Sequence, residues 1–142
     1  MSPRVIIKPS TALAGEFARR AAEVASRSVR ERGRFSIALS GGSIAPALLP
    51  ALARSAIRWD ATSFFWIDER AVPPDDPESN YGSAVKLLSG TPAAGAQFHP
   101  MELVGDLERS ARAYSDTLIS ELGMPPVLDI VMLGVGDDGH VA

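Results

Sequence analysis

The chain reads Asp129-Ile-Val-Met-Leu-Gly-Val-Gly-Asp-Asp-Gly-His-Val-Ala142 over its last residues, where an apolar run passes directly into a loop of glycines and acids. The apolar part, residues 127–133, predicts a buried strand. The three glycines of the loop let the backbone turn sharply and let a ligand approach it. In an open α/β sheet, ligands bind outside the carboxyl ends of the strands. His140 therefore stands where a ligand is expected, and a histidine suits proton transfer near neutral pH.

The composition is typical of one globular domain. The 142 residues are 46% hydrophobic, which is enough apolar side chain for a real core. The net charge is −3 and the basic residues are scattered, so we expect no nucleic-acid partner. We expect no membrane association, because no apolar run has spanning length and the N-terminus lacks a signal-peptide core. The absence of cysteine excludes disulfides and thiolate chemistry, and suits a cytoplasmic location.

Strand and helix patterns alternate along the chain. Strands are expected at Arg4–Lys8, Arg34–Leu39, Thr62–Ile67 and Val127–Leu133. Helices are expected from Ser10 or Thr11 to about Gly33, around 47–53 with Pro50 limiting or kinking it, near Ser83–Leu88, and over about Asp106–Leu122. This alternation predicts an α/β fold with a doubly wound, mostly parallel, Rossmann-like sheet and helices on both faces. Loops after three of the strands would then meet at one edge and form a composite site.

The first of these loops is Ser40-Gly-Gly-Ser43, between a strand and a helix. Converging backbone N–H groups, serine hydroxyls and a helix N-terminus suit it to an anion such as phosphate. The alternative is a tight turn with no ligand. The loop is not a P-loop, because no Gly-Lys-Ser/Thr follows.

The second loop begins with Trp66-Ile-Asp-Glu-Arg70. Neighbouring residues of an extended chain point in different directions, so Asp68, Glu69 and Arg70 are not all expected to face one ligand. The planar guanidinium of Arg70 is shaped to grip a phosphate, while one acid would position the site. The alternative is an acidic turn with a solvated arginine. The acids are not arranged as in a calcium loop, so we predict no metal.

The third loop, Gly134-Val-Gly-Asp-Asp-Gly139, matches the Gly-x-Gly-x-x-Gly pattern of dinucleotide-binding folds. Two acids inside the turn would repel a pyrophosphate, and no helix follows, so the dinucleotide hypothesis is weak. Asp138 beside His140 favours a functional histidine over a structural one. His99, in a Phe-His-Pro sequence between elements, is expected to be structural.

Three blocks together, Ser40–Ser43, Trp66–Gly82 and Leu133–His140, resemble the 6-phosphogluconolactonase family in order and spacing. The middle block is the most specific, since Asp-Glu-Arg and Ser-Asn-Tyr-Gly occur in it together. The wider superfamily includes glucosamine-6-phosphate deaminase, which shares the strand-end Asp-Glu and the Asp-Gly-His. That pattern lacks the combination of Arg70 with Val72-Pro73-Pro74 found here.

The resemblance implies hydrolysis of 6-phospho-D-glucono-1,5-lactone to 6-phospho-D-gluconate in the pentose phosphate pathway. It implies no metal and no organic cofactor. His140 would be the general base that activates water, with Asp138 helping to position the site. The residues expected to bind the substrate and its phosphate are Ser40, Gly41, Gly42, Ser43, Asp68 and Arg70. The alternatives are a sugar-phosphate deaminase or isomerase of the same superfamily, and a truncated relative that binds phosphosugars without turnover.

Two departures from the family pattern matter. Ile44 stands where the family usually has threonine after Ser-Gly-Gly-Ser, so one hydroxyl donor is missing. Family members also continue well beyond the His-x-Ala segment, so we expect residues 1–142 to be the N-terminal portion of a single lactonase domain. A cut through the sheet would expose apolar surface and unpaired strand groups. We expect a monomer or a weak homodimer.

Overall fold

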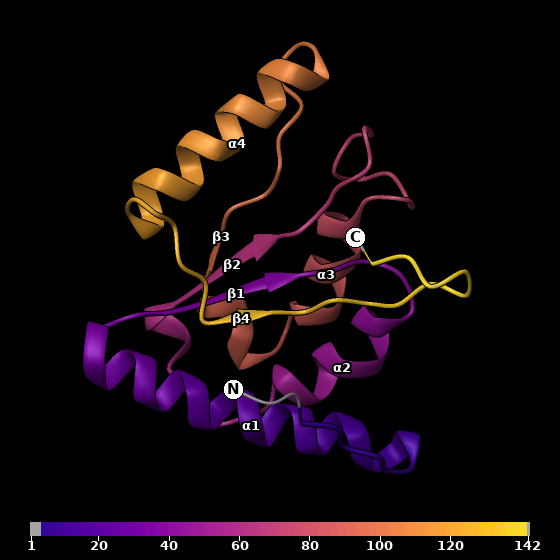
Figure 1. Cartoon of the computed structure of the whole chain (residues 1–142), viewed down its shortest axis with the longest axis vertical. Coiled ribbons are helices and arrows are strands. Elements are labelled where there is room, and N and C mark those ends of the chain that lie inside the picture. Colours follow the sequence, from indigo (N-terminus) through magenta and orange to yellow (C-terminus); the bar gives the residue numbers. More distant parts are fainter. Residues whose placement is uncertain (1–3, 142) are drawn as a thin grey trace.

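The computed structural model describes residues 4–141. Its centre is a sheet of four parallel strands in the order β3-β2-β1-β4 (Figure 1). The strands are β1 (Phe35–Leu39), β2 (Thr62–Trp66), β3 (Gln97–Phe98) and β4 (Ile130–Val131). The helices are α1 (Ser10–Arg32), α2 (Ile44–Leu52), α3 (Asn80–Leu88) and α4 (Leu107–Leu122), with 3-10 turns η1 (Trp59–Ala61) and η2 (Pro92–Gly95).

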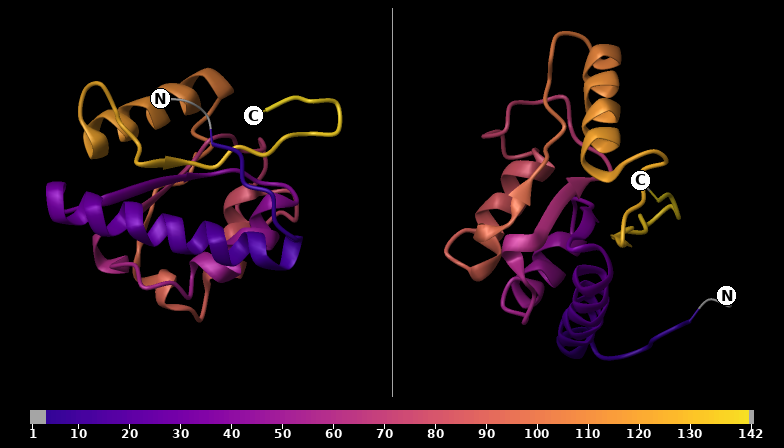
Figure 2. Two further views of the ribbon diagram at one scale, coloured as in Figure 1. Left: turned by 60° about the horizontal axis from the view of Figure 1, so that its bottom comes forward. Right: turned by 90° about the vertical axis from the view of Figure 1, so that its left-hand side faces the viewer.

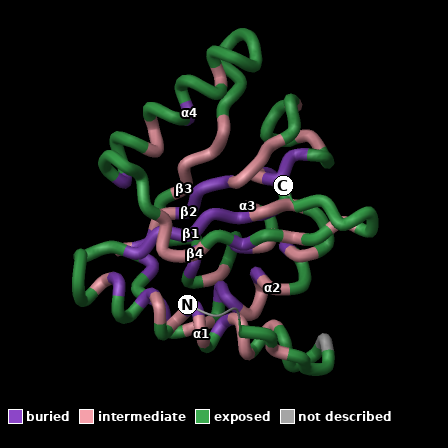
Figure 3. The backbone as a smooth tube through the Cα atoms, viewed as in Figure 1, coloured by how far each residue is buried: buried purple, intermediate pink, exposed green. Residues whose placement is uncertain are grey.

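Side chains alternate between the two faces of the sheet, as the pleat requires. Phe35, Ile37 and Leu39 of β1 belong to the main core, which they share with α1, α2 and α3. Ala38 points to the other face, where it joins Phe65 in a smaller core closed by α4. Figure 2 shows α1 and α4 on opposite sides of the sheet, and Figure 3 shows that burial is concentrated in the strands. The predicted doubly wound α/β sheet with helices on both faces is confirmed.

The route of the chain creates a crevice in the sheet. From β1 the chain passes through α2 to β2 and through α3 to β3, always moving outward on one side. It then crosses through α4 and returns to β4, on the other side of β1. The connection that leaves β1 through α2 and the connection that enters β4 through α4 therefore lie on opposite faces of the sheet. Such a topological switch point is where doubly wound sheets bind ligands.

Local signals explain where several helices begin and end. Gly33 takes the left-handed conformation with φ 75° and ends α1, while its N–H donates to the Val29 carbonyl. The Asp106 side chain caps α4 by accepting the Arg109 N–H at 2.8 Å. α2 contains Pro50 and ends two residues later, at Leu52. No helix of the described residues is long and apolar enough to cross a membrane.

One predicted strand is wrong. Arg4–Lys8 has no regular secondary structure, and Val5 and Ile7 are 80% and 91% exposed. A β-branched run becomes a strand only beside a partner, and residues 4–141 supply none for this segment. The helix that follows begins at Ser10 after Pro9, and no side chain caps it.

Other differences concern short elements and element bounds. β3, η1 and η2 were not predicted, because two to four residues carry no readable periodicity. α3 begins at Asn80 rather than near Ser83, because the Ser79 hydroxyl caps it by accepting the Gly82 N–H at 3.0 Å. β4 is shorter than the predicted 127–133, although hydrogen bonds on either side of it continue the contact with β1.

Candidate active site

A cavity of about 610 Å³ lies at the carboxyl ends of β1, β2 and β4. Its lining comes from all three loops singled out in the sequence, and from the first residue of α3. The lining residues are Ser40–Ile44, Asp68, Arg70, Asn80, Leu133–Gly136 and His140, together with Ala47 of α2. Segments separated by almost a hundred residues of sequence thus line one cavity. This is the composite site expected at one edge of a parallel sheet.

The first loop presents backbone N–H groups to the cavity. Gly42 has φ 68°, a left-handed conformation that favours glycine, so the turn requires this residue. α2 then begins at Ile44, and the first N–H groups of a helix have no partner within it. Ser43 makes no side-chain capping bond, so its hydroxyl is not used within the helix. This arrangement suits an oxyanion, although Pro46 in the first turn has no N–H to donate.

The second loop divides its three charged residues between two tasks. Asp68 and Arg70 line the cavity, whereas Glu69 does not. Glu69 instead accepts the backbone N–H groups of Asn80 at 2.7 Å and Tyr81 at 2.8 Å, at the start of α3. An anion at a helix N-terminus stabilises the helix. Glu69 is therefore a structural anchor of the loop, and Asp68 is the acid that faces the cavity.

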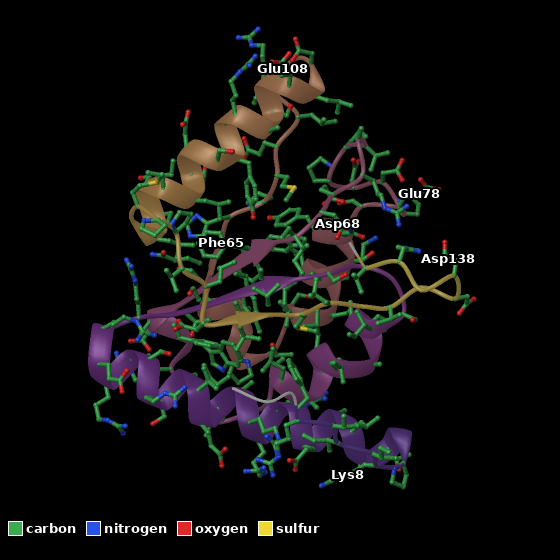
Figure 4. The ribbon with its side chains drawn as sticks, in the orientation of Figure 1. Lys8, Phe65, Asp68, Glu78, Glu108 and Asp138 are labelled. Atoms are coloured by element: carbon green, nitrogen blue, oxygen red, sulfur yellow. The ribbon has the colours of Figure 1, made fainter. Side chains whose placement is uncertain are left out.

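Asp68 has an unusual environment for a carboxylate. Its Oδ1 atom is buried and accepts no hydrogen bond from any described residue. Its Oδ2 atom lies 3.5 Å from the Asn80 amide nitrogen. A buried oxygen without a partner costs free energy that a ligand hydroxyl would recover. Figure 4 shows Asp68 beside the strand ends, while Asp138 lies farther out on the last loop.

The third loop carries the histidine. The loop is closed by hydrogen bonds between Gly136 N–H and the His140 carbonyl, and between Gly139 N–H and the Gly136 carbonyl, both at 2.9 Å. His140 Nδ1 contacts the Asp138 carboxylate, and both side chains are exposed. Asp138 also accepts the His140 backbone N–H at 3.2 Å. These two contacts, the imidazole first, lower the pKa of Asp138.

This pairing assigns different tasks to the two ring nitrogens. An ionised carboxylate only accepts hydrogen bonds, so Nδ1 of a neutral His140 carries the proton. Nε2 is then the nitrogen that can accept a proton from another molecule. His140 lines the cavity whereas Asp138 does not, so Asp138 acts on the cavity only through the imidazole.

The remaining sequence candidates lie elsewhere. The ring of His99 stacks on Phe65 at 4.7 Å between centroids, on the α4 side of the sheet. Asp76 accepts the Glu78 N–H at 2.8 Å within the loop that follows Arg70. Within residues 4–141, no three histidine, aspartate or glutamate side chains gather closely enough to hold a metal ion. Sequence reasoning did not assign a site to Asn80, although its place in the Ser-Asn-Tyr-Gly block was a usable signal.

A doubly wound sheet with a polar cavity at its switch point defines a ligand-binding α/β domain of the Rossmann-like class. Within that class, the chain belongs to the family described as glucosamine-6-phosphate isomerases/6-phosphogluconolactonase, whose model matches residues 8–142.

Among the relatives, the 6-phosphogluconolactonase of Synechocystis is 40% identical over 123 residues, which are 82% of this chain and 51% of that protein. A crystal structure of a 6-phosphogluconolactonase from Shewanella baltica superposes with a TM-score of 0.85 at 29% identity, and covers 95% of this chain and 57% of its own. The enzyme from Trypanosoma cruzi gives a TM-score of 0.80 at 31% identity, over 97% of this chain and 60% of its own. The chain thus spans about half the length of the curated relatives it matches.

Proposed function

We propose that this chain carries the substrate-binding and base-bearing part of a 6-phosphogluconolactonase, which hydrolyses 6-phospho-D-glucono-1,5-lactone to 6-phospho-D-gluconate. The observation that carries the proposal is the meeting of three loops around one cavity, with His140 on its wall. Family membership and lactonase relatives over most of the chain support the same reaction.

The chemistry follows from the two ring nitrogens of His140. Nε2 takes a proton from water while the water oxygen adds to the lactone carbonyl carbon, giving a tetrahedral oxyanion. The oxyanion collapses, the bond between that carbon and the ring oxygen breaks, and the ring oxygen takes the proton from the imidazolium. Asp138 stabilises the imidazolium through Nδ1. A lactone is an activated ester, so the reaction needs no covalent nucleophile.

The phosphate end of the substrate is assigned to the other two loops. Ser40–Ser43 offers hydroxyl and backbone N–H donors, and Arg70 offers a guanidinium. Asp68 would repel a phosphate, so this residue of the cavity wall is assigned to a sugar hydroxyl. Holding the phosphate far from the carbonyl fixes the orientation of the lactone relative to His140.

Further parts of the proposal concern the setting of the enzyme. We infer a reaction that uses no metal ion or organic cofactor, since the described steps need only protons and hydrogen-bond donors. We expect a monomer or weak homodimer, and a cytoplasmic location suited to a chain without cysteine. Two relatives carry other locations in their names, a chloroplastic lactonase of rice and an endoplasmic bifunctional protein of rabbit.

The test is the decay of freshly made 6-phosphogluconolactone, measured with this chain against buffer, because the lactone also opens spontaneously. We expect His140→Ala to abolish the acceleration and to leave the affinity for 6-phosphogluconate within a few-fold of wild type. Asp137→Ala is the matched control, since Asp137 is exposed in the same loop and does not line the cavity. Full acceleration by the His140→Ala variant would remove His140 from the proposed role.

Two other results would replace this function with one of its alternatives. Release of ammonia from glucosamine 6-phosphate, without lactone hydrolysis, would identify a deaminase. Binding of 6-phosphogluconate by the folded wild-type chain, without acceleration of lactone opening, would favour a truncated relative that binds phosphosugars without turnover.

A further inference from the structure

Asn80 lies where the three sequence blocks meet, and only 6% of its surface is exposed. Its side-chain amide donates to the backbone carbonyl of Asp68 at 3.0 Å, and lies 3.5 Å from the Asp68 Oδ2 atom. Its amide oxygen lies against Gly41 of the first loop. A Cβ atom built on Gly41 would stand 1.8 Å from that oxygen.

The backbone fixes the direction of this side chain. Asn80 is the first residue of α3, and its N–H donates to Glu69 Oε1 at 2.7 Å. Glu69 also accepts a hydrogen bond from the Ser79 hydroxyl at 3.2 Å. Its carboxylate therefore joins the start of the second loop to the residues where that loop ends and α3 begins. The side chain of Asn80 therefore projects from a rigid helix start between the first and second loops.

Gly41 and Gly42 are glycines for different reasons. Gly42 has a left-handed backbone, whereas Gly41 does not. Gly41 is a glycine because the Asn80 amide fills the space that a Cβ atom would need. Asn80 thus lies between Gly41 of the first loop and Asp68 of the second.

We propose that Asn80 is a positioning residue, which holds the Asp68 carboxylate and the Gly41 backbone in fixed relation around the cavity. The amide donor beside Oδ2 restrains rotation of the carboxylate, whose Oδ1 atom is buried and has no hydrogen-bond partner among the described residues. This inference rests on the proposed function for the identity of the ligand. The packing of Asn80 against Gly41 does not depend on it.

The packing is tested by a double-mutant cycle on thermal unfolding. We expect Gly41→Ala to lower the melting temperature clearly in the wild-type background, and by less than half as much in the Asn80→Ala background. Gly15→Ala is the control, because a Cβ atom at Gly15 meets nothing within 4 Å. Equal effects of Gly41→Ala in the two backgrounds would overturn the packing claim.

The positioning of Asp68 is tested by the affinity for 6-phosphogluconate, measured by calorimetry on wild type and Asn80→Asp. The variant keeps the shape of the side chain but replaces the donor by a second carboxylate. We expect its affinity to fall at least tenfold at pH 8, measured at a temperature where the variant is folded, because two carboxylates then lie close together in a largely buried position. We expect Asn80→Leu, which has a similar shape and adds no charge, to lose affinity as well, because it also lacks the amide donor. A merely structural role would lower the melting temperature and leave the affinity of the folded variants near that of wild type.

The outcomes separate the two proposals. A folded wild-type chain that neither binds 6-phosphogluconate nor accelerates lactone opening would overturn the proposed function, and the mutant cycle would still decide the role of Asn80. Wild-type binding together with unchanged affinity in the folded Asn80→Asp and Asn80→Leu variants would overturn the positioning role and leave the proposed function intact.

Discussion

At the scale of single residues, Gly136 of the last loop leaves space for the His140 imidazole. A Cβ atom at Gly136 would lie 2.3 Å from Cε1 and 2.5 Å from Nδ1 of His140. Gly136 does not have a left-handed backbone, so alanine suits its conformation. The imidazole is the part that must move, and it lies at the end of a flexible side chain.

We therefore expect Gly136→Ala to lower the rate of lactone hydrolysis about tenfold or more, because displacement of a catalytic group by about 1 Å has effects of this size. The melting temperature should change little. Parallel rate and melting measurements check this, with Gly15→Ala as the variant that leaves the rate unchanged. A Gly136→Ala enzyme with the wild-type rate would show that the imidazole is not confined by this contact.

At the scale of elements, the Tyr114 hydroxyl joins α4 to the end of β2. The Tyr114 hydroxyl accepts the Trp66 N–H at 2.7 Å and donates to the Trp66 carbonyl at 2.9 Å, beyond the point where β3 ends. It thus replaces the missing strand partner at the end of β2, directly before the Asp-Glu-Arg loop. Burial raises the pKa of Tyr114 to about 12, so the hydroxyl remains a donor at neutral pH.

Removing this hydroxyl in Tyr114→Phe leaves two backbone groups without a partner. We expect a loss of about 1–3 kcal/mol in the free energy of unfolding, measured by urea denaturation at pH 7. The folded pKa lies above the unfolded one, so this contribution is complete below about pH 10 and declines as the pH rises toward 12. The difference between wild type and Tyr114→Phe should therefore shrink over that range. A difference in the free energy of unfolding that stays constant over this pH range would contradict the link to the raised pKa of Tyr114.

The accuracy of sequence-based prediction also depends on the kind of element. Long periodic helices and buried strands were predictable, because each signal repeats over several turns or alternations. β3 has two residues, and the ladder it forms depends on a partner distant in sequence. Arg4–Lys8 has the same local pattern as a strand but pairs with no strand among the described residues. Pairing is a tertiary property that composition alone does not specify.

The candidate site likewise has features that were predictable from the sequence and features that depend on tertiary contacts. The cavity follows from topology, so the sequence predicted that the loops after Leu39, Ile67 and Leu133 would meet. The division of labour between Asp68 and Glu69 was not predictable, because it depends on which carboxylate reaches the N-terminus of α3. Asn80 was missed for a related reason. Its task is defined by Gly41, which lies in another block of sequence.

At the scale of the whole molecule, β4 is an edge of the sheet. It pairs with β1 on one side and has no strand on its other side among residues 4–141. Val131 and Leu133 are about half exposed there, and Val127 is 67% exposed. An edge that combines unpaired backbone groups with apolar side chains is a template for association with another chain.

We therefore expect this chain to self-associate through β4, and Val131→Lys to shift it toward monomer, because a charge on an edge strand opposes edge-to-edge pairing. Sedimentation velocity over a range of concentrations measures this. Ile119→Lys is the matched control, since Ile119 is exposed to a similar degree on α4, away from the edge. If the two variants shift the equilibrium equally, the effect comes from net charge. If wild type stays monomeric at every concentration, the exposed edge does not pair. A shift confined to Val131→Lys would locate the association at β4, beside the loop that carries His140.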